Sequence, residues 1–207
     1  MGLSAEQLRS SLDALAAIEP AFARGLDRAG YPEPRIRERG YETLLRTIVG
    51  QQVSVAAASS IWNKLEAAVG SGLAPKAVAA APEELLRDAG LSRQKISYAK
   101  SLAEKVALGE LDLKRLPGDD EEAIAALTRI KGIGRWSAEI YLLFAEGRAD
   151  VWPAGDLAVQ IEVGRIMGLD ERPSERSTRA LAEGWRPHRG AAAIFAWHHR
   201  RAGAPAV

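Results

Sequence analysis

Leu127-Thr-Arg-Ile-Lys-Gly-Ile-Gly-Arg-Trp-Ser-Ala-Glu-Ile140 is the stretch that decides the fold. The residues before it open with Asp119-Asp-Glu-Glu, and acidic side chains favour the positive end of a helix dipole. The residues after it have apolar side chains at helical spacing. Two glycines in the short connection, Gly132 and Gly134, permit positive φ and a close approach of the backbone. The stretch therefore predicts a helix–hairpin–helix.

A hairpin of this kind can bind the nucleic-acid backbone. The second helix begins with N–H groups that have no acceptor inside the helix, so Gly132, Ile133, Gly134 and Arg135 are the candidate phosphate-binding residues. Such contacts position a duplex without reading its sequence. The alternative is an ordinary turn between two helices, which needs glycine for the same conformational reason.

The second informative stretch is Asp150-Val-Trp-Pro-Ala-Gly-Asp156, an irregular approach to an apolar helix. Asp156 can cap that helix with its carboxylate. The same carboxylate could act chemically, because backbone donors that fix it also favour its charged form. Both roles can hold at once.

Ile130–Ala138 and Asp150–Asp156 together resemble the helix–hairpin–helix DNA glycosylase superfamily, with its Gly/Pro-rich loop and Asp. Within it the chain is most similar to the alkylated-base branch, 3-methyladenine DNA glycosylase II. The same branch is matched by Gly50-Gln-Gln-Val-Ser54, Ala182-Glu-Gly-Trp-Arg-Pro187 and Ala193-Ile-Phe-Ala-Trp197. These motifs cover most of the chain in the family's order.

The resemblance implies an all-α, two-lobed fold with a cleft between the lobes, and without the N-terminal β-domain of longer relatives. Residues 1–207 would form one glycosylase unit. The middle lobe is expected at about 41–150, and the helices of 1–40 and 157–207 would form the second lobe. Composition agrees with all-α, since the chain is Ala- and Leu-rich and has no convincing period-two segment.

The resemblance also implies a reaction, with Asp156 as the catalytic residue. A purine methylated at N3 or N7 carries positive charge and leaves without a general acid, so one carboxylate suffices to stabilise the cationic sugar. Bifunctional relatives place a Schiff-base lysine where Trp136 stands, and Lys131 lies in the wrong place. We therefore expect a monofunctional DNA-3-methyladenine glycosylase II type hydrolase of base excision repair, without lyase activity.

Several further residues have expected roles in receiving a flipped base. Trp136 and Trp197 match the branch's pocket aromatics, and Tyr141 is a further candidate. Gln52 stands where a wedge side chain enters the gap left by the base, although Gln51 and Gln52 could instead cap a broken helix. Core packing is the expectation for two other tryptophans, Trp62 and Trp185.

The expected partner is double-stranded DNA that contains alkylated bases, and no cofactor is required. Na⁺ or K⁺ is the one ion that the resemblance implies, held by the backbone carbonyls of Thr128, Ile130 and Ile133. The sequence contains no cysteine, which excludes disulfides and the iron–sulfur cluster of endonuclease III-type relatives. His188, His198 and His199 lack metal-ligand spacing and are expected at the surface or facing phosphate.

Net charge and hydrophobicity along the chain bear on the binding partner and on the cellular compartment. The formal net charge is only +1, which counts against a strongly basic DNA binder unless charges are segregated, with arginines such as Arg186 and Arg189 late in the chain. No apolar run is long enough to span a membrane, and the N-terminus does not resemble a signal peptide. We expect a cytoplasmic, nucleoid-associated monomer with no membrane contact.

Two other functions remain open at this stage. A non-catalytic helix–hairpin–helix module that binds damaged or bent DNA would need no acid at Asp156. A helical protein-interaction domain would use Gly132 and Gly134 as ordinary turn residues. The clearest expected helices are Ser4–Ile18, Tyr41–Val49, Arg93–Leu108, Leu157–Met167, Ser174–Glu183 and Arg189–Arg200. Pro20 is expected to end the first of them, Ser54 to cap another and Pro82 to open one more.

Overall fold

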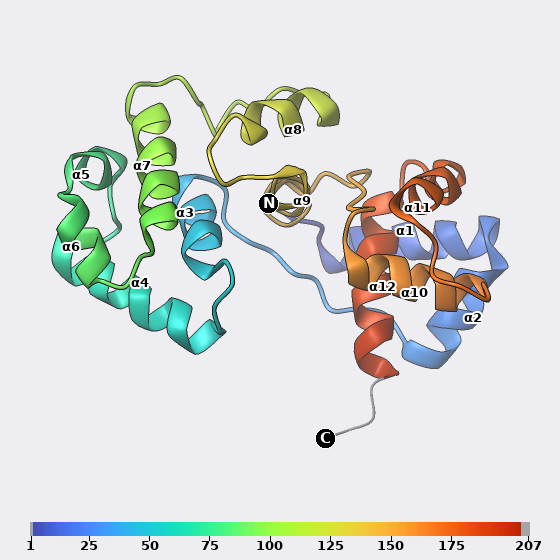
Figure 1. Ribbon diagram of the computed structural model, residues 1–207. Coiled ribbons are helices and arrows are strands. Elements are labelled where there is room, and N and C mark those ends of the chain that lie inside the picture. Colours follow the sequence, from blue (N-terminus) through green and yellow to red (C-terminus); the bar gives the residue numbers. More distant parts are fainter. Residues whose placement is uncertain (1, 204–207) are drawn as a thin grey trace. The chain divides into compact units, whose positions relative to one another are not determined.

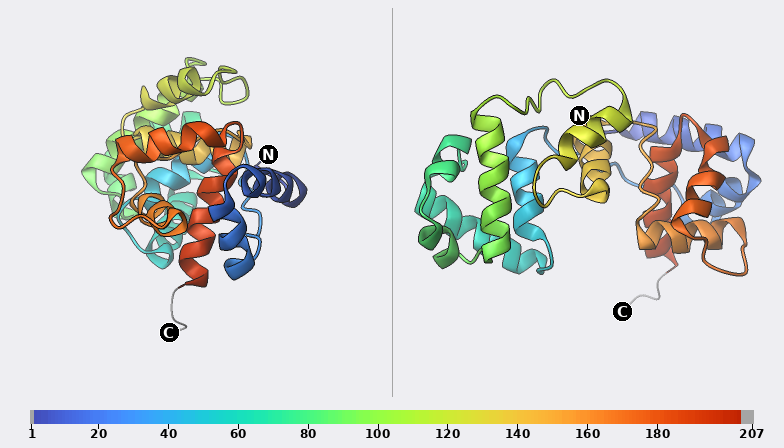
Figure 2. Two further views of the ribbon diagram at one scale, coloured as in Figure 1. Left: turned by 90° about the vertical axis from the view of Figure 1, so that its right-hand side faces the viewer. Right: turned by 45° about the horizontal axis from the view of Figure 1, so that its top comes forward.

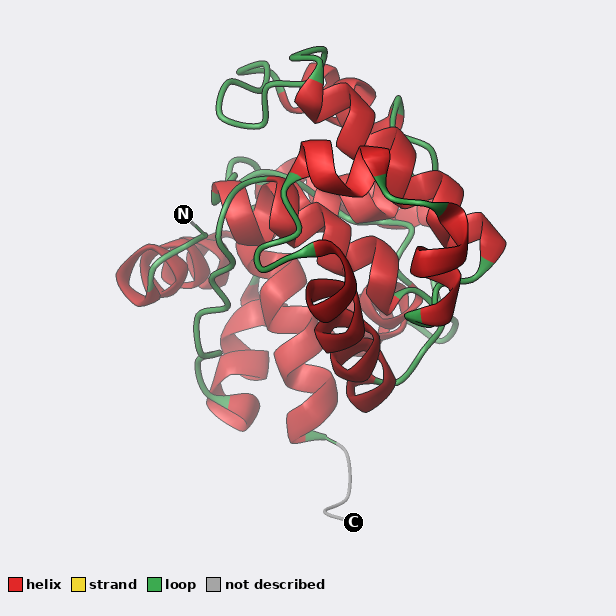
Figure 3. Ribbon diagram, turned by 90° about the vertical axis from the view of Figure 1, so that its left-hand side faces the viewer, coloured by secondary structure: helices red, strands yellow, loops and turns green. Residues whose placement is uncertain are grey.

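The computed structural model describes residues 2–203, which form helices and loops and contain no strand (Figure 3). The all-α prediction is confirmed. The chain divides into two compact units: unit 1 joins the segment ending at Arg37 to the segment starting at Leu142, and unit 2 is Glu38–Tyr141. The sequence placed these boundaries near residues 40 and 150. Each unit is described by itself.

Unit 2 contains the hairpin. Its helices are α3 (Tyr41–Gly50), α4 (Val55–Val69), α5 (Pro75–Ala80), α6 (Glu83–Asp88), α7 (Arg93–Ala107), α8 (Asp120–Thr128) and α9 (Arg135–Tyr141). Within this unit α7 packs against α3 and α5 (Figure 1). Leu44 and Ile48 of α3 and Ile96 and Leu102 of α7 are fully buried, so α7 forms the centre of this core.

Unit 1 contains the segment that carries Asp156. Its elements are α1 (Ala5–Ile18), α2 (Pro20–Ala29), the π-helical turn Leu142–Glu146, α10 (Leu157–Met167), α11 (Glu175–Leu181), the 3₁₀ turn Ala182–Trp185 and α12 (Arg189–Ala202). Helix α12 packs against α1, α2 and α10, and Figure 2 shows α12, in red, beside the blue N-terminal helices.

An aromatic cluster fills the core of unit 1. Trp185 meets Phe22 edge-on at a centroid distance of 5.0 Å and Trp152 at 5.6 Å, and Phe195 lies 6.0 Å from Phe22. Such edge-to-face pairs stabilise a core beyond the burial of their area. Trp185 is 3% exposed, so its core role is confirmed, as is that of Trp62 in unit 2, also at 3%.

Local signals predicted many helix starts correctly. Ser4 forms a capping box with Gln7, and the side chains of Ser54 and Ser92 accept hydrogen bonds from the first turns of their helices. Helices α2 and α5 were not predicted from the sequence. Pro20, which was expected only to end α1, occupies the first position of α2, where its missing N–H has no cost. No described helix is long and apolar enough to cross a bilayer.

Candidate active site

Asp156 is the N-cap of α10, as expected, but it makes a second contact that a cap does not need. Its Oδ1 accepts a hydrogen bond from Val159 N (3.0 Å) and another from Trp197 Nε1 of α12 (3.3 Å). The side chain is half-buried. Two donors from different elements fix the rotation of the carboxylate.

The loop that leads to Asp156 is anchored along its length by polar contacts. Trp152 and Ala154, which lie within it, are buried. The contacts are Gly190 N to Ala149 O (2.7 Å), Trp152 Nε1 to Thr178 O (3.2 Å), Gln160 Nε2 to Ala154 O (2.8 Å) and Asp156 N to Pro153 O (2.9 Å). Gly190 is needed here, because a Cβ at that residue would lie 2.6 Å from Ala149 O. The loop is thus tied to α10, α11 and α12.

An ion-pair network holds the start of this loop. Asp150 Oδ2 lies 2.8 Å from both Arg186 Nη1 and Arg189 Nη2, and Glu183 pairs with the same two arginines at 3.0 Å. The hydrogen bond from Arg186 lowers the pKa of Glu183 and raises the pKa of Arg186. Both arginines are therefore committed to carboxylates, and the late basic cluster expected from the sequence is largely neutralised there.

The three candidate pocket aromatics lie in different surroundings. The half-buried Trp197 packs on Phe144 with ring centroids 5.6 Å apart, and its indole N–H donates a hydrogen bond to Asp156. Trp136, in the first turn of α9, is 47% exposed and can present its ring to a ligand. Tyr141 is only 2% exposed, and its hydroxyl accepts a hydrogen bond from Gly40 N (2.8 Å). That placement favours a structural role for Tyr141, at the start of α3.

The hairpin connection is a tight turn. Ile133 N donates to Ile130 O (3.1 Å), and Gly132 at the third position has φ +84°, as a type II turn requires. A Cβ on Gly132 would lie 2.1 Å from Cδ2 of Tyr98, so glycine is required sterically as well. A Cβ on Gly134 would meet no atom within 4 Å, and the φ of Gly134 is not positive. The two glycines of the motif therefore have different physical roles.

Arg135, a predicted phosphate ligand, is engaged by carboxylates. Its guanidinium pairs with Glu121 of α8 through both terminal nitrogens and with Glu139 through Nε (2.9 Å). The hydrogen bonds to Glu121 raise the pKa of Arg135. The side chain thus joins the two helices of the hairpin, and the backbone of the turn is the better candidate for phosphate contact.

Comparison with known proteins identifies the family. Residues 45–187, which include the hairpin and Asp156, match the family model described as HhH-GPD superfamily base excision DNA repair protein. The chain belongs to this superfamily. DNA-3-methyladenine glycosylase 1 of Schizosaccharomyces pombe is 34% identical over 167 residues, which are 78% of this chain and 72% of that protein.

Two solved structures support the assignment of the chain to the HhH-GPD superfamily. DNA-3-methyladenine glycosidase from Bacillus halodurans superposes with a TM-score of 0.84 at 30% identity, covering 93% of this chain and 89% of that one. The S. pombe 3-methyladenine DNA glycosylase Mag1 in complex with abasic DNA gives a TM-score of 0.76 at 31% identity, covering 91% and 95%. The resemblance stated from the motifs is thereby confirmed.

Gln52 of this HhH-GPD protein projects from the turn between α3 and α4. It is exposed and has φ +55°, a conformation that few non-glycine residues adopt. Gln51 is the C-cap of α3 through its backbone N–H, which donates to Ile48 O (3.3 Å), while its side-chain Nε2 donates to Gly132 O (2.9 Å). The bond from Gln51 to Gly132 joins residues 81 positions apart and has no local signal in the sequence.

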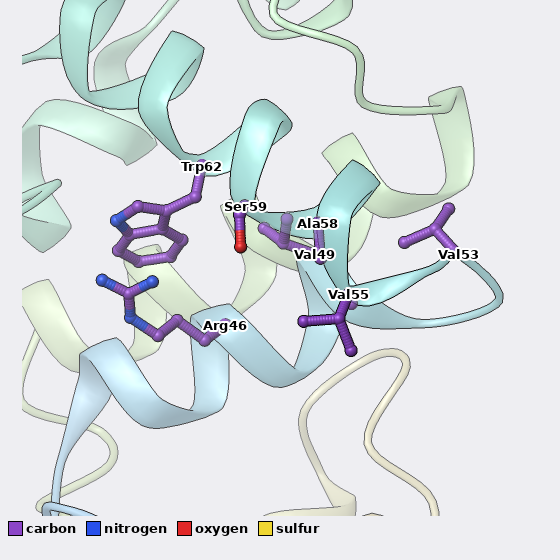
Figure 4. A pocket seen from close by; sticks show the side chains of 8 residues that line it. Arg46, Val49, Val53, Val55, Ala58, Ser59 and Trp62 are labelled. Atoms are coloured by element: carbon purple, nitrogen blue, oxygen red, sulfur yellow. The ribbon is translucent and has the colours of Figure 1, made fainter.

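A pocket of about 190 Å³ opens beside this turn, between α3 and α4 (Figure 4). The Arg46 guanidinium lies 3.7 Å from the centroid of the Trp62 ring in a cation–π contact. The lining residues are Arg46, Val49, Gly50, Val53, Val55, Ala58, Ser59 and Trp62. They include no carboxylate or imidazole, so the pocket offers no group for acid–base chemistry.

The histidines differ from the sequence expectation. His199 Nδ1 lies 2.9 Å from Oε2 of Glu162, which is 1% exposed, and His198 Nε2 lies 2.7 Å from Ala29 O. Both rings are half-buried in contacts between helices of unit 1, so they are less exposed than the sequence led us to expect. Among residues 2–203, no group of three or more His, Cys, Asp or Glu side chains could hold a metal ion.

Proposed function

We propose that this HhH-GPD protein is a monofunctional DNA glycosylase that hydrolyses the N-glycosidic bond of alkylated purines, of the 3-methyladenine or 7-methylguanine type, in base excision repair. The observation that carries the proposal is the Asp156 carboxylate, held by the N–H groups of Val159 and Trp197. The relatives named above as 3-methyladenine glycosylases support the same substrate class.

One carboxylate is enough for this reaction. An alkylated purine is already cationic, so it departs as a neutral base without protonation by a general acid. The bond to the base breaks as positive charge develops on the deoxyribose, and the negative charge of Asp156 stabilises that transition state. Asp156 also orients or deprotonates the attacking water, whose oxygen then bonds to the sugar carbon.

A flipped base needs an aromatic surface to receive it. The exposed ring of Trp136 and the accessible part of Trp197 suit a cationic, electron-poor base, which stacks on indole faces more strongly than a neutral base. No lysine stands at position 136, and Lys131 belongs to the turn. We therefore propose that water is the nucleophile and that the strand is not nicked.

Double-stranded DNA would be bound through the backbone of the hairpin. The proposed contacts are the N–H groups at Gly132, Ile133, Gly134 and Arg135. We propose that the carbonyls of Thr128, Ile130 and Ile133 would hold a Na⁺ or K⁺ ion; Ile130 O accepts one hydrogen bond from Ile133 N and keeps a second lone pair for such an ion. When bound, that ion would supply positive charge near a phosphate. The protein would act as a monomer in the cytoplasm, on the nucleoid.

The test is base release from methylated duplex DNA by the parent and by Asp156→Asn. The asparagine keeps an oxygen that can accept from Val159 N, so the helix cap and the fold should survive while the charge is lost. We expect release to fall on the order of 100-fold or more with duplex binding retained. Duplex binding by a parent that releases no base from any alkylated duplex would instead support the non-catalytic DNA-binding module.

A further inference from the structure

The turn between α3 and α4 has a backbone that its sequence does not favour. Gln51 has φ −59° and ψ 129°, close to the first central residue of a type II turn, and Gln52 has φ +55°, in the left-handed region where the second central residue of such a turn lies. Glycine or asparagine is the usual residue at the second of these positions. A glutamine there keeps a side chain at a point where glycine would be easier to fold, and such an outlier suggests a function for the side chain.

The two glutamines of this turn have opposite surroundings. Gln51 is half-buried and donates from Nε2 to Gly132 O, the carbonyl of the hairpin turn (2.9 Å). Gln52 is exposed, and the apolar side chains beside it are exposed as well, Val53 by 39% and Val55 by 85%. Figure 4 shows these two valines near the turn. One glutamine therefore faces the hairpin and its neighbour faces solvent.

Helix α7 holds both turns from one side. Lys95 Nζ donates to Val49 O near the end of α3 (2.7 Å), and the Tyr98 ring packs against Gly132. Lys95 and Tyr98 are three positions apart and so share a face of α7. Partial burial lowers the pKa of Lys95. Helix α7 thus contacts the end of α3 and the hairpin turn, and the bond from Gln51 adds a direct link between the α3–α4 turn and the hairpin.

We propose that Gln51 is a positioning residue, which sets the spacing between the side chain of Gln52 and the phosphate-binding hairpin. This inference rests on the proposed function. Base extrusion requires the protein to hold a phosphate and to fill the vacated stack at the same nucleotide step. Gln51 bonds to the hairpin, and Gln52 projects from the same turn. The bond therefore keeps the phosphate contact and the side chain that fills the vacated stack at the same nucleotide step.

The experiment measures unstacking of DNA, not base release. The probe is a duplex in which 2-aminopurine lies beside a stable abasic analogue, and its fluorescence rises when the base unstacks. Gln51→Leu keeps the bulk of the side chain and removes the hydrogen bond. We expect the fluorescence rise at saturating protein to fall about fivefold, as for loss of one hydrogen bond, while affinity for undamaged duplex changes less than about twofold.

A double-mutant comparison separates positioning from general damage to the fold. Gln52→Ala should reduce the fluorescence rise to a similar extent, and the Gln51→Leu/Gln52→Ala pair should lose little more than either single variant. Gln7→Leu, which removes a side-chain contact to Ser4 N in the other unit, is the matched control and should behave as the parent.

Three results would overturn the inference: no effect of Gln51→Leu, an equal loss of affinity for undamaged duplex, or losses that add in the double variant. A parent that does not raise the fluorescence also overturns it. Failure of the glycosylase proposal is distinguished from these results, because it would be seen as absent base release with the unstacking signal intact. Circular dichroism of each variant checks that the helices are retained.

Discussion

Replacement of Gly132 by alanine should destabilise unit 2, whereas the same change at Gly134 should not. The two glycines are alike in sequence but differ in structure. Gly132 has φ +84° and would place a Cβ 2.1 Å from Cδ2 of Tyr98 and 2.4 Å from its Cγ, whereas Gly134 meets no atom within 4 Å. Comparing Gly132→Ala with Gly134→Ala therefore separates the cost of strain and clash in the turn from the general effect of replacing a glycine.

The expected magnitude has two parts. A left-handed conformation costs an alanine about 1–2 kcal/mol. Overpacking against the Tyr98 ring costs about 1–3 kcal/mol more, because the ring must rotate or the turn must move. Gly132→Ala should therefore lower the free energy of unfolding by about 2–5 kcal/mol. Gly134→Ala should leave it unchanged or raise it by about 0.4–1 kcal/mol, since alanine reduces the entropy of the unfolded chain.

Urea-induced unfolding followed by far-UV circular dichroism measures both changes. A second pair of variants tests the cause: in a Tyr98→Ala background, Gly132→Ala should cost only the backbone part, about 1–2 kcal/mol. Equal midpoints for Gly132→Ala and Gly134→Ala would refute the reasoning. So would an unchanged cost of Gly132→Ala in the background that lacks the Tyr98 ring.

Three other outcomes are expected. Trp197→Phe keeps a ring beside Phe144 but removes a hydrogen bond to a carboxylate, so single-turnover base release should fall about tenfold or more with duplex affinity unchanged; an unchanged rate would remove the indole N–H from the mechanism. Lys131 is exposed, so Lys131→Gln should reduce the slope of log affinity against log salt concentration by about 1. Arg135 is already paired with two carboxylates, so Arg135→Gln should change that slope by clearly less. Titrations of a fluorescent duplex at several salt concentrations measure both slopes. Gly190→Ala should displace the loop before Asp156, because its Cβ would lie 2.6 Å from a loop carbonyl, and should reduce both the melting temperature and base release; release at the parental rate would show that the loop tolerates the shift.

Local features of the fold were predictable because their causes are local. Ser4 and Gln7 form a capping box within one turn, and the helix Leu157–Met167 was predicted with its observed bounds, between the cap at Asp156 and Gly168 in the left-handed region. Helix α2 was missed because Pro20 was treated only as a terminator, although proline also favours the first position of a helix.

The candidate site was predictable in its residue types but not in its pairings. The position of Asp156 at a helix start follows from the motif, whereas its contact with Trp197 joins residues 41 positions apart. Arg135 was assigned to phosphate because it follows the glycines, and its bonds to Glu121 depend on how α8 packs against α9. Tyr98 had no signal in the sequence, because nothing in a helical pattern shows which partner its ring will meet.

The anchored loop before Asp156 has a consequence for altering substrate range. A carboxylate whose preceding loop is tied to three helices is difficult to reposition by nearby substitutions. Changes at the buried residues Trp152 and Ala154 would break packing and hydrogen bonds before they moved the charge. Selection for new lesions should therefore yield changes at solvent-facing positions such as Trp136 and Gln52, while the 149–156 segment stays as it is.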